Sequence, residues 1–293
     1  MTAMNSTKTA FVLSGGGLLG STQVGMLHAL LERDIHPDLI LGASIGALNG
    51  AGFAQNPTMD GVHNLTQLWL DVVDRKPFSG SVIERVSTLA KQKVAIFDNS
   101  ELKLLLEQKM KFKNIEELPI QFQCVAASIE RAAETWFERG EIVPAVLASA
   151  AAPGIYPPVK IDNEHYFDGG IVNPIPVDRA RKLGATRIFV LQVGRIEQAL
   201  TLPTNPIGSA LTALEVARRA RFNAAFAKAE ETIEMHLLPT GSNAVMSVDR
   251  AAFDPREAIR PNPSQPHVGR WQGRVQVQEH RSAFAVEYSR NGT

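Results

Sequence analysis

The sequence has few of the features that mark secreted or nucleic-acid-binding proteins. Its 293 residues contain a single cysteine, Cys124, so no disulfide framework can form, and this fits a reducing compartment. Its 30 basic residues are balanced by 30 acidic ones, which leaves no broad basic field for nucleic acid. We therefore expect no nucleic-acid partner.

Long apolar runs are also missing. Glycine, proline or a charged residue interrupts each run before the ~18 residues that a spanning helix needs, so we expect any membrane contact to be peripheral. Residues 1–10 lack the basic and apolar regions of a secretory signal, which favours a cytoplasmic protein. Metal ligands in motif spacing are absent from the sequence, and we expect neither a metal nor another cofactor.

Apolar periodicity alternates between strand and helix along most of the chain. Strand patterns at 9–13 and 39–41 flank a helical pattern at 21–33, and such a unit implies parallel pairing with a right-handed crossover. The same alternation continues with predicted strands at 120–127, 135–138, 159–161, 166–167, 187–193 and 232–238, and with predicted helices at 47–54, 142–152, 177–183 and 207–230. We expect one α/β domain with a mostly parallel sheet and helices on both faces.

The predicted domain spans residues 1–246. Beyond it arginine and proline become frequent and the periodicity weakens. We therefore treat residues 247–293 as a C-terminal extension.

A glycine-rich segment, Gly15-Gly16-Gly17-Leu18-Leu19-Gly20, joins the first predicted strand to the first predicted helix. Its backbone N–H groups and the helix dipole favour an anion, which could be a phosphate or the oxyanion of acyl transfer. The segment also matches the dinucleotide pattern G-x-G-x-x-G, so a nucleotide-binding module is an alternative. That pattern requires an acidic residue at the end of the second strand, whereas Asp38 stands at its start. A phosphate-binding P-loop would need lysine where Ser21 stands.

The second motif, Gly42-Ala43-Ser44-Ile45-Gly46, matches the nucleophile elbow G-x-S-x-G. It falls at a predicted strand-to-helix junction, where its two glycines permit a sharp turn. The turn would project Ser44 from the carboxyl end of the sheet, beside the amino end of the next helix. Ser44 is therefore the candidate nucleophile.

A serine nucleophile needs a base. The histidines after Ser44 lie outside any recognisable catalytic loop, which makes a histidine triad a weaker alternative; they are His63, His165, His236, His267 and His280. Asp168-Gly169-Gly170 is the better candidate. Asp-Gly on its own is typical of a turn or a helix cap, and Asp168 gains weight only beside the other two motifs.

In this order the three motifs resemble those of the patatin-like phospholipase family. The segment Ser149-Ala150-Ala151-Ala152-Pro153 is similar to the stretch near the family's catalytic acid, and the resemblance covers about residues 10–180. It implies a three-layer α/β fold and cofactor-free hydrolysis of lipid acyl esters by a Ser-Asp dyad. The implied roles are nucleophile for Ser44, general base for Asp168, oxyanion hole for Gly15, Gly16 and Gly17, elbow for Gly42 and Gly46, and acid loop for Gly169 and Gly170.

One position departs from the family pattern. The family usually has arginine or lysine before the last glycine of its loop, and this chain has Leu19. The substitution leaves neutral or lysolipid esters as alternatives to a phospholipid, and it gives some weight to a non-catalytic lipid-binding protein of the same fold.

Two groups of basic residues are either solvated faces or surfaces that dock on anionic lipid. They are Lys103, Lys109, Lys111 and Lys113, and Arg218, Arg219 and Arg221.

Overall fold

The computed structural model describes residues 7–75, 95, 97–193, 199–230 and 233–238. Its strands are β1 (Thr9–Leu13), β2 (Leu39–Ala43), β3 (Gln121–Ser128), β4 (Ala133–Phe137), β5 (Val159–Ile161), β6 (Glu164–Asp168), β7 (Arg187–Leu191) and β8 (Glu234–Leu238). Its α-helices are α1 (Ser21–Leu31), α2 (Ile45–Ala54), α3 (Met59–Arg75), α5 (Ser100–Lys109), α6 (Ile142–Ser149), α7 (Val177–Lys182) and α8 (Pro206–Glu230). Short 3-10 helices are η1 (Gly17–Gly20), η2 (Ile115–Glu117) and η3 (Gly169–Ile171).

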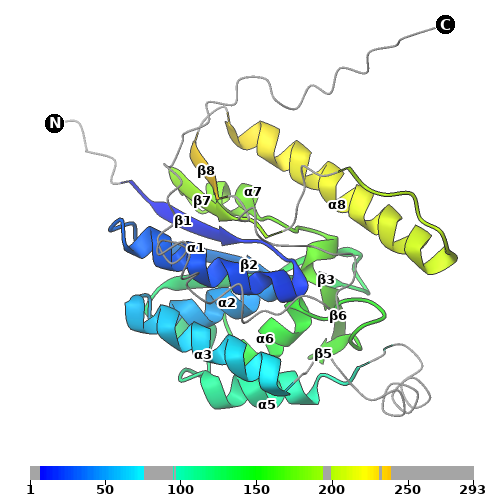
Figure 1. The fold of residues 1–293 in the computed structure, drawn as a ribbon, viewed down its shortest axis with the longest axis horizontal. Helices are drawn as coiled ribbons and strands as arrows, with labels where there is room; N and C mark the ends of the chain where they lie inside the picture. The colour runs from blue at the N-terminus through cyan, green and yellow to red at the C-terminus, as the bar shows by residue number, and fades with distance from the viewer. Residues whose placement is uncertain (1–6, 76–94, 96, 194–198, 231–232, 239–293) are drawn as a thin grey trace, which may run out of the picture.

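The strands form one mixed sheet, as predicted (Figure 1). Five of them, in the order β3-β2-β1-β7-β8, are parallel. Strands β4 and β6 pair antiparallel with β3, and β5 pairs antiparallel with β6. The predicted α/β class with a mostly parallel sheet is therefore confirmed.

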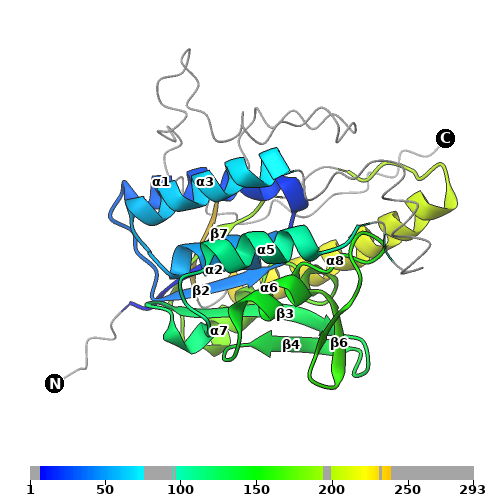
Figure 2. The same ribbon diagram turned by 90° about the horizontal axis from the view of Figure 1, so that it is seen from below.

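Helices cover both faces of the sheet, so the domain has three layers (Figures 1 and 2). Alternating side chains of β1 show why: Phe11 and Leu13 join the core beneath α1, α2 and α3, whereas Ala10 and Val12 join the core beneath α7 and α8. Because both faces are buried, these strands read as continuous apolar runs in the sequence.

The register around β3 brings two strand ends together. Val125 pairs with Ala43 of β2 and with Trp136 of β4, whereas the next residue, Ala126, pairs with Asp168 of β6 and again with β4. Since a strand has only two edges, β2 and β6 share the edge of β3 opposite β4. The two strands run in opposite directions along that edge, and their carboxyl ends meet beside Val125 and Ala126.

The other sequence-based expectations fare as follows. Helices α3 and α5 lie between the predicted helix at 47–54 and the predicted strand at 120–127, and the predicted strand at 232–238 corresponds to β8. The predicted extension at 247–293 lies outside the described residues. Within the described part of the chain, helices are too short or too polar to span a bilayer.

Candidate active site

Ser44 occupies a strained turn between β2 and α2. Its backbone has φ 56° and ψ −125°, in a region that residues other than glycine rarely adopt. The flanking glycines are required by close packing: a Cβ on Gly46 would lie 2.2 Å from the carbonyl oxygen of Leu13, and a Cβ on Gly42 would lie 2.4 Å from that of Gly46. A sharp strand-to-helix turn thus stands where the sequence predicts the elbow, and α2 begins directly after Ser44 with its positive dipole end toward the turn.

Ser149, at the end of α6, supports the strained turn through a hydrogen bond to its backbone. The N–H of Ser44 donates to Ser149 Oγ at 3.0 Å, and that hydroxyl donates to the carbonyl oxygen of Val125 at 2.6 Å. Ser149 is fully buried. The sequence marked this residue only as part of a motif, because nothing local indicates a partner 105 positions away.

Asp168 meets Ser44 because β2 and β6 end at the same point of the sheet. The Ser44 hydroxyl donates to Asp168 Oδ2 at 2.5 Å, and the N–H of Gly170 donates to Oδ1 at 2.6 Å. A Cβ on Gly169 would lie 2.0 Å from the carbonyl oxygen of Val125, so this glycine lets the acid loop pass close to β3. The carboxylate is therefore aimed at the hydroxyl by contacts on both of its oxygens.

The electrostatic environment of Asp168 favours proton acceptance. Burial raises the pKa of its carboxyl group, while the hydrogen bonds from Ser44 and Gly170 and the positive charge of Arg218 oppose that rise. Arg218 belongs to α8, which packs against η3. The sequence contains no local sign that Arg218 lowers the pKa of Asp168, because the two residues lie on elements far apart in the chain.

The glycine loop lies directly against the elbow. A Cβ on Gly15 would stand 3.1 Å from Ser44 Cβ, and a Cβ on Gly16 would stand 2.4 Å from Val193 Cγ2. The N–H of Gly15 donates to the carbonyl oxygen of Pro174 at 3.3 Å, so in this structure it already has a partner within the protein. Hydrogen bonds from the N–H groups of Gly16 and Gly17 to other described residues are absent. These two remain the candidate donors.

Leu19 and Asp38 bear on the alternatives. Leu19 is part of η1 and packs against the main core, so the loop carries an apolar side chain where the family pattern has a cation. The Asp38 carboxylate accepts from the N–H of Thr9 at 2.7 Å, at the end of the strands opposite the glycine loop. This position disfavours the nucleotide-binding interpretation.

The histidines that the structure describes do not assemble a triad with Ser44. His165 Nδ1 lies 2.7 Å from Glu130, His236 stacks on Phe189 and lies 2.8 Å from Glu234, and His63 is exposed on α3. His267 and His280 lie outside the described residues. In the ranges that the structure describes, hydrogen bonds between a histidine and Ser44 or Asp168 are absent.

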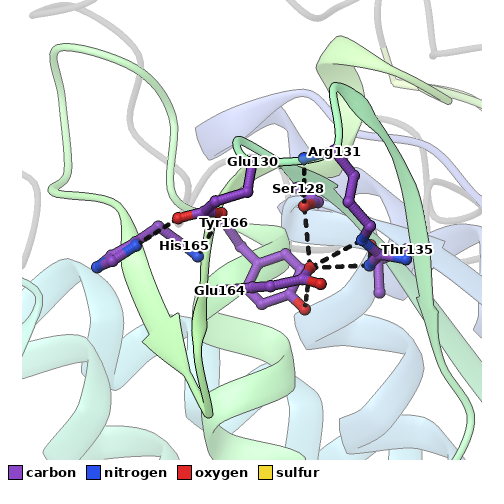
Figure 3. A network of polar contacts seen from close by, with 7 residues as sticks. All are labelled: Ser128, Glu130, Arg131, Thr135, Glu164, His165 and Tyr166. Atoms are coloured by element: carbon purple, nitrogen blue, oxygen red, sulfur yellow. Dashed lines mark hydrogen bonds and ion pairs between the residues drawn. The ribbon is translucent and has the colours of Figure 1, made fainter.

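A polar network fastens the start of β6, the strand that ends at Asp168 (Figure 3). Glu164 Oε2 accepts hydrogen bonds from Ser128 Oγ at 2.9 Å, Arg131 Nε at 2.9 Å and the Tyr166 hydroxyl at 3.0 Å. Beside it, hydrogen bonds from the backbone and the ring of His165 lower the pKa of Glu130 to about 2. The network joins the turn between β3 and β4 to the start of β6, at the end of that strand away from Asp168.

Most of the basic residues singled out in the sequence are paired with carboxylates. The pairs are Lys103 with Glu107, Lys109 with Asp71, Lys113 with Glu141, Arg218 and Arg219 with Glu215, and Arg221 with Glu134. Groups of three or more side chains suited to a metal ion do not occur in the described ranges.

Comparison with known proteins agrees with this geometry. The family model described as "Patatin-like phospholipase" matches residues 11–181, more than half of the chain. The chain belongs to the patatin-like phospholipase family. The match contains the glycine loop, the elbow and the acid loop, but it ends before α8.

Similar curated proteins carry the same family name or a related one. "Patatin-like phospholipase domain-containing protein 7" of Rattus norvegicus is 31% identical over 195 residues, which cover 66% of this chain and 14% of the relative. "Lysophospholipase nte1" of Aspergillus terreus is 28% identical over 186 residues, which cover 64% of this chain and 12% of the relative. The chain thus aligns with only a small part of these much longer relatives.

Among solved structures, VipD from Legionella pneumophila is similar to this chain with a TM-score of 0.38 and 17% identity. The alignment covers 63% of this chain and 49% of VipD. A likeness of this degree adds nothing to the family assignment, which depends on the sequence match.

Proposed function

We propose that this patatin-like protein is a serine acyl-ester hydrolase that acts on lipid esters. In this proposal Ser44 is the nucleophile and Asp168 is the general base. The observation that supports it best is the 2.5 Å hydrogen bond from Ser44 Oγ to a buried Asp168, on an elbow whose backbone is strained. Strain of this kind is typical of functional sites, where the surrounding structure maintains it.

The first half of the reaction forms an acyl-enzyme. Ser44 Oγ attacks the ester carbonyl carbon as its proton passes to Asp168 Oδ2, and the carbonyl oxygen becomes an oxyanion. The ester C–O bond then breaks, and the leaving alcohol takes the proton from Asp168. In the second half a water molecule gives its proton to Asp168 and attacks the acyl carbon, after which the proton returns to Ser44 Oγ as the acid leaves.

Two features of the site would lower the barrier. A carboxylate with a raised pKa is a better match for a hydroxyl proton than an ordinary aspartate is. The N–H groups of Gly16 and Gly17 would stabilise the oxyanion, and loss of one such donor typically costs about 2.7–4 kcal/mol. Both features act through the chain's own groups and need no cofactor.

The proposed substrates are phospholipids, lysophospholipids or neutral acyl esters. The family description and the lysophospholipase name of the Aspergillus relative support a lipid ester. Leu19, within the loop, stands where the family pattern has a cation, so this position offers no charge to attract an anionic group. Docking on anionic lipid stays a prediction, and vesicle binding that ignores lipid charge and salt would count against it.

The test is hydrolysis of p-nitrophenyl esters with short and long acyl chains, together with labelling by a fluorophosphonate probe. Wild-type protein should release p-nitrophenol and take the label on Ser44, and folded Ser44→Ala protein should do neither. Asp168→Asn should remove most of the turnover without unfolding the protein. Substantial activity in folded Ser44→Ala protein, or a folded wild type with neither activity nor label, would overturn the proposal.

A further inference from the structure

A chain of buried amides lies beneath the glycine loop. Gln23 of α1 donates through Nε2 to the carbonyl oxygens of Ser14 and Leu191, each at 2.9 Å. Asn49 of α2 donates through Nδ2 to the carbonyl oxygen of Gly20 and to Gln23 Oε1, each at 2.8 Å. Trp69 of α3 donates through Nε1 to Asn49 Oδ1 at 2.9 Å. The side chains of Gln23, Asn49 and Trp69 have no solvent exposure.

The two loop carbonyls in this chain belong to the residues that bracket the three glycines. Ser14 immediately precedes them, and Gly20 closes η1 after them. Both ends of the loop are therefore held by side-chain amides from helices that the loop itself does not contain.

The hold on Ser14 also orients the first glycine. The peptide group between Ser14 and Gly15 is planar, so its carbonyl and its N–H point in opposite directions. The carbonyl accepts from Gln23, while the N–H donates to the carbonyl oxygen of Pro174 at 3.3 Å. Because the plane of this peptide group is fixed by both hydrogen bonds, the backbone enters Gly16 and Gly17 in a defined orientation, and this helps to orient their N–H groups.

The connection to the nucleophile passes through α2. Asn49 lies five positions after Ser44 on the helix that begins at Ile45, so its amide is carried by the same rigid element as the elbow. We propose that Gln23 and Asn49 are positioning residues that keep the glycine loop in register with Ser44. The catalytic part of this inference rests on the proposed function, whereas the structural part does not.

Packing alone does not account for these residues. Apolar side chains of similar size would fill the same space, and buried amides are tolerated only when each of their polar groups is satisfied. Here the donors of both amides end on the loop carbonyls, on Leu191 beside the loop or on each other. The hydrogen-bond donors of Gln23 and Asn49 are thus used mainly to hold the backbone of the glycine loop.

The test compares Gln23→Met with a matched control. Gln123 of β3 is also a buried glutamine with two polar partners, Glu138 at 3.1 Å and Arg179 at 2.9 Å, but it contacts neither the loop nor the elbow. Gln123→Met therefore also removes two hydrogen bonds of a buried glutamine, at a place away from the loop and to partners that are partly exposed. Trp69→Phe keeps an aromatic ring but removes the donor to Asn49 together with part of the buried ring system, so it serves as the second variant if Gln23→Met does not fold.

Two readouts separate positioning from general destabilisation. Gln23→Met should lower kcat for a p-nitrophenyl ester about 10- to 100-fold with little change in KM, as expected when oxyanion donors are misplaced. The N–H groups of Gly15 and Leu19 donate to the carbonyl oxygens of Pro174 and Gly16, and their amide hydrogen exchange should become faster in Gln23→Met. Gln123→Met should change neither quantity, and Trp69→Phe should change both in the same direction by less.

Unchanged exchange of Gly15 and Leu19 in Gln23→Met, or in Trp69→Phe if the first variant is unfolded, would overturn the inference. An equal loss of kcat in Gln123→Met at the same stability would also overturn it. A wild-type protein without hydrolase activity would refute the proposed function instead, and the exchange measurement would still decide whether the amides position the loop.

Discussion

Replacing Ser149 by alanine should destabilise the elbow and slow the proposed reaction. The hydroxyl of Ser149 is the partner of the Ser44 N–H at 3.0 Å and donates to the carbonyl oxygen of Val125 at 2.6 Å; Ser149 and Val125 are fully buried, and Ser44 is half-buried. Alanine would leave both groups without these hydrogen bonds, and water cannot reach the buried Val125 carbonyl without opening the structure.

The size of the effect follows from those two groups. An unsatisfied buried polar group costs about 1–3 kcal/mol. The half-buried Ser44 N–H costs less than the buried Val125 carbonyl, so we expect a loss of about 2–4 kcal/mol in the free energy of unfolding. For a domain of this size that corresponds to a decrease in Tm of about 4–16 °C. Ser44 would also lose a contact that maintains its φ of 56°, and a displaced nucleophile should lower kcat by about 10- to 100-fold.

The assay is thermal unfolding followed by circular dichroism, with ester hydrolysis measured well below both transitions. Ser128→Ala is the matched control, because Ser128 is buried on the same strand as Val125 and also makes two hydrogen bonds, to Glu164 and Arg131. Those partners are partly exposed, so water can replace the lost hydroxyl and the effect should be small. An unchanged Tm and kcat in Ser149→Ala would refute this account of how the elbow is held.

Three further outcomes are expected. Asp168 must be deprotonated to act as a base, and its pKa is raised, so the decrease of kcat/KM at acid pH should begin above the ordinary pKa of aspartate. Arg218→Gln removes a positive charge that lowers the pKa of Asp168, so it should shift this decrease of kcat/KM to higher pH. An unshifted pH–rate profile in Arg218→Gln would contradict this. At neutral pH, Asp168→Asn should have a Tm equal to or above that of the wild type, because burial disfavours the charged carboxylate. The difference in Tm should shrink as the pH falls and wild-type Asp168 becomes protonated. A lower Tm for Asp168→Asn at neutral pH would argue against this effect of burial. Gly46→Ala should prevent stable folding, because the added Cβ would collide with the backbone of Leu13. Gly25→Ala should instead stabilise the protein by about 0.5–1 kcal/mol, because a Cβ at this position of α1 meets nothing within 4 Å. Equal denaturation midpoints for the two variants would be inconsistent with this packing.

Local pattern was sufficient for the elements and for the position of the elbow. Continuous apolar runs predicted the parallel strands, and glycines around Ser44 predicted a strand-to-helix turn, because backbone freedom and periodicity depend on residues close together in the chain. The structure contains these elements with small differences at their ends. The identity of the loop as an anion-binding segment was likewise suggested by its glycines alone.

Contacts between distant parts of the chain were decided only by the tertiary structure. Ser44 and Asp168 are 124 positions apart, and they meet because β2 and β6 end on the same edge of β3, a matter of sheet register that no single segment encodes. The engagement of the Gly15 N–H by Pro174, the support of the elbow by Ser149 and the charge of Arg218 near Asp168 depend on packing in the same way. The sequence by itself determined which groups could react, and the three-dimensional packing of sheet and helices determined which of them face one another.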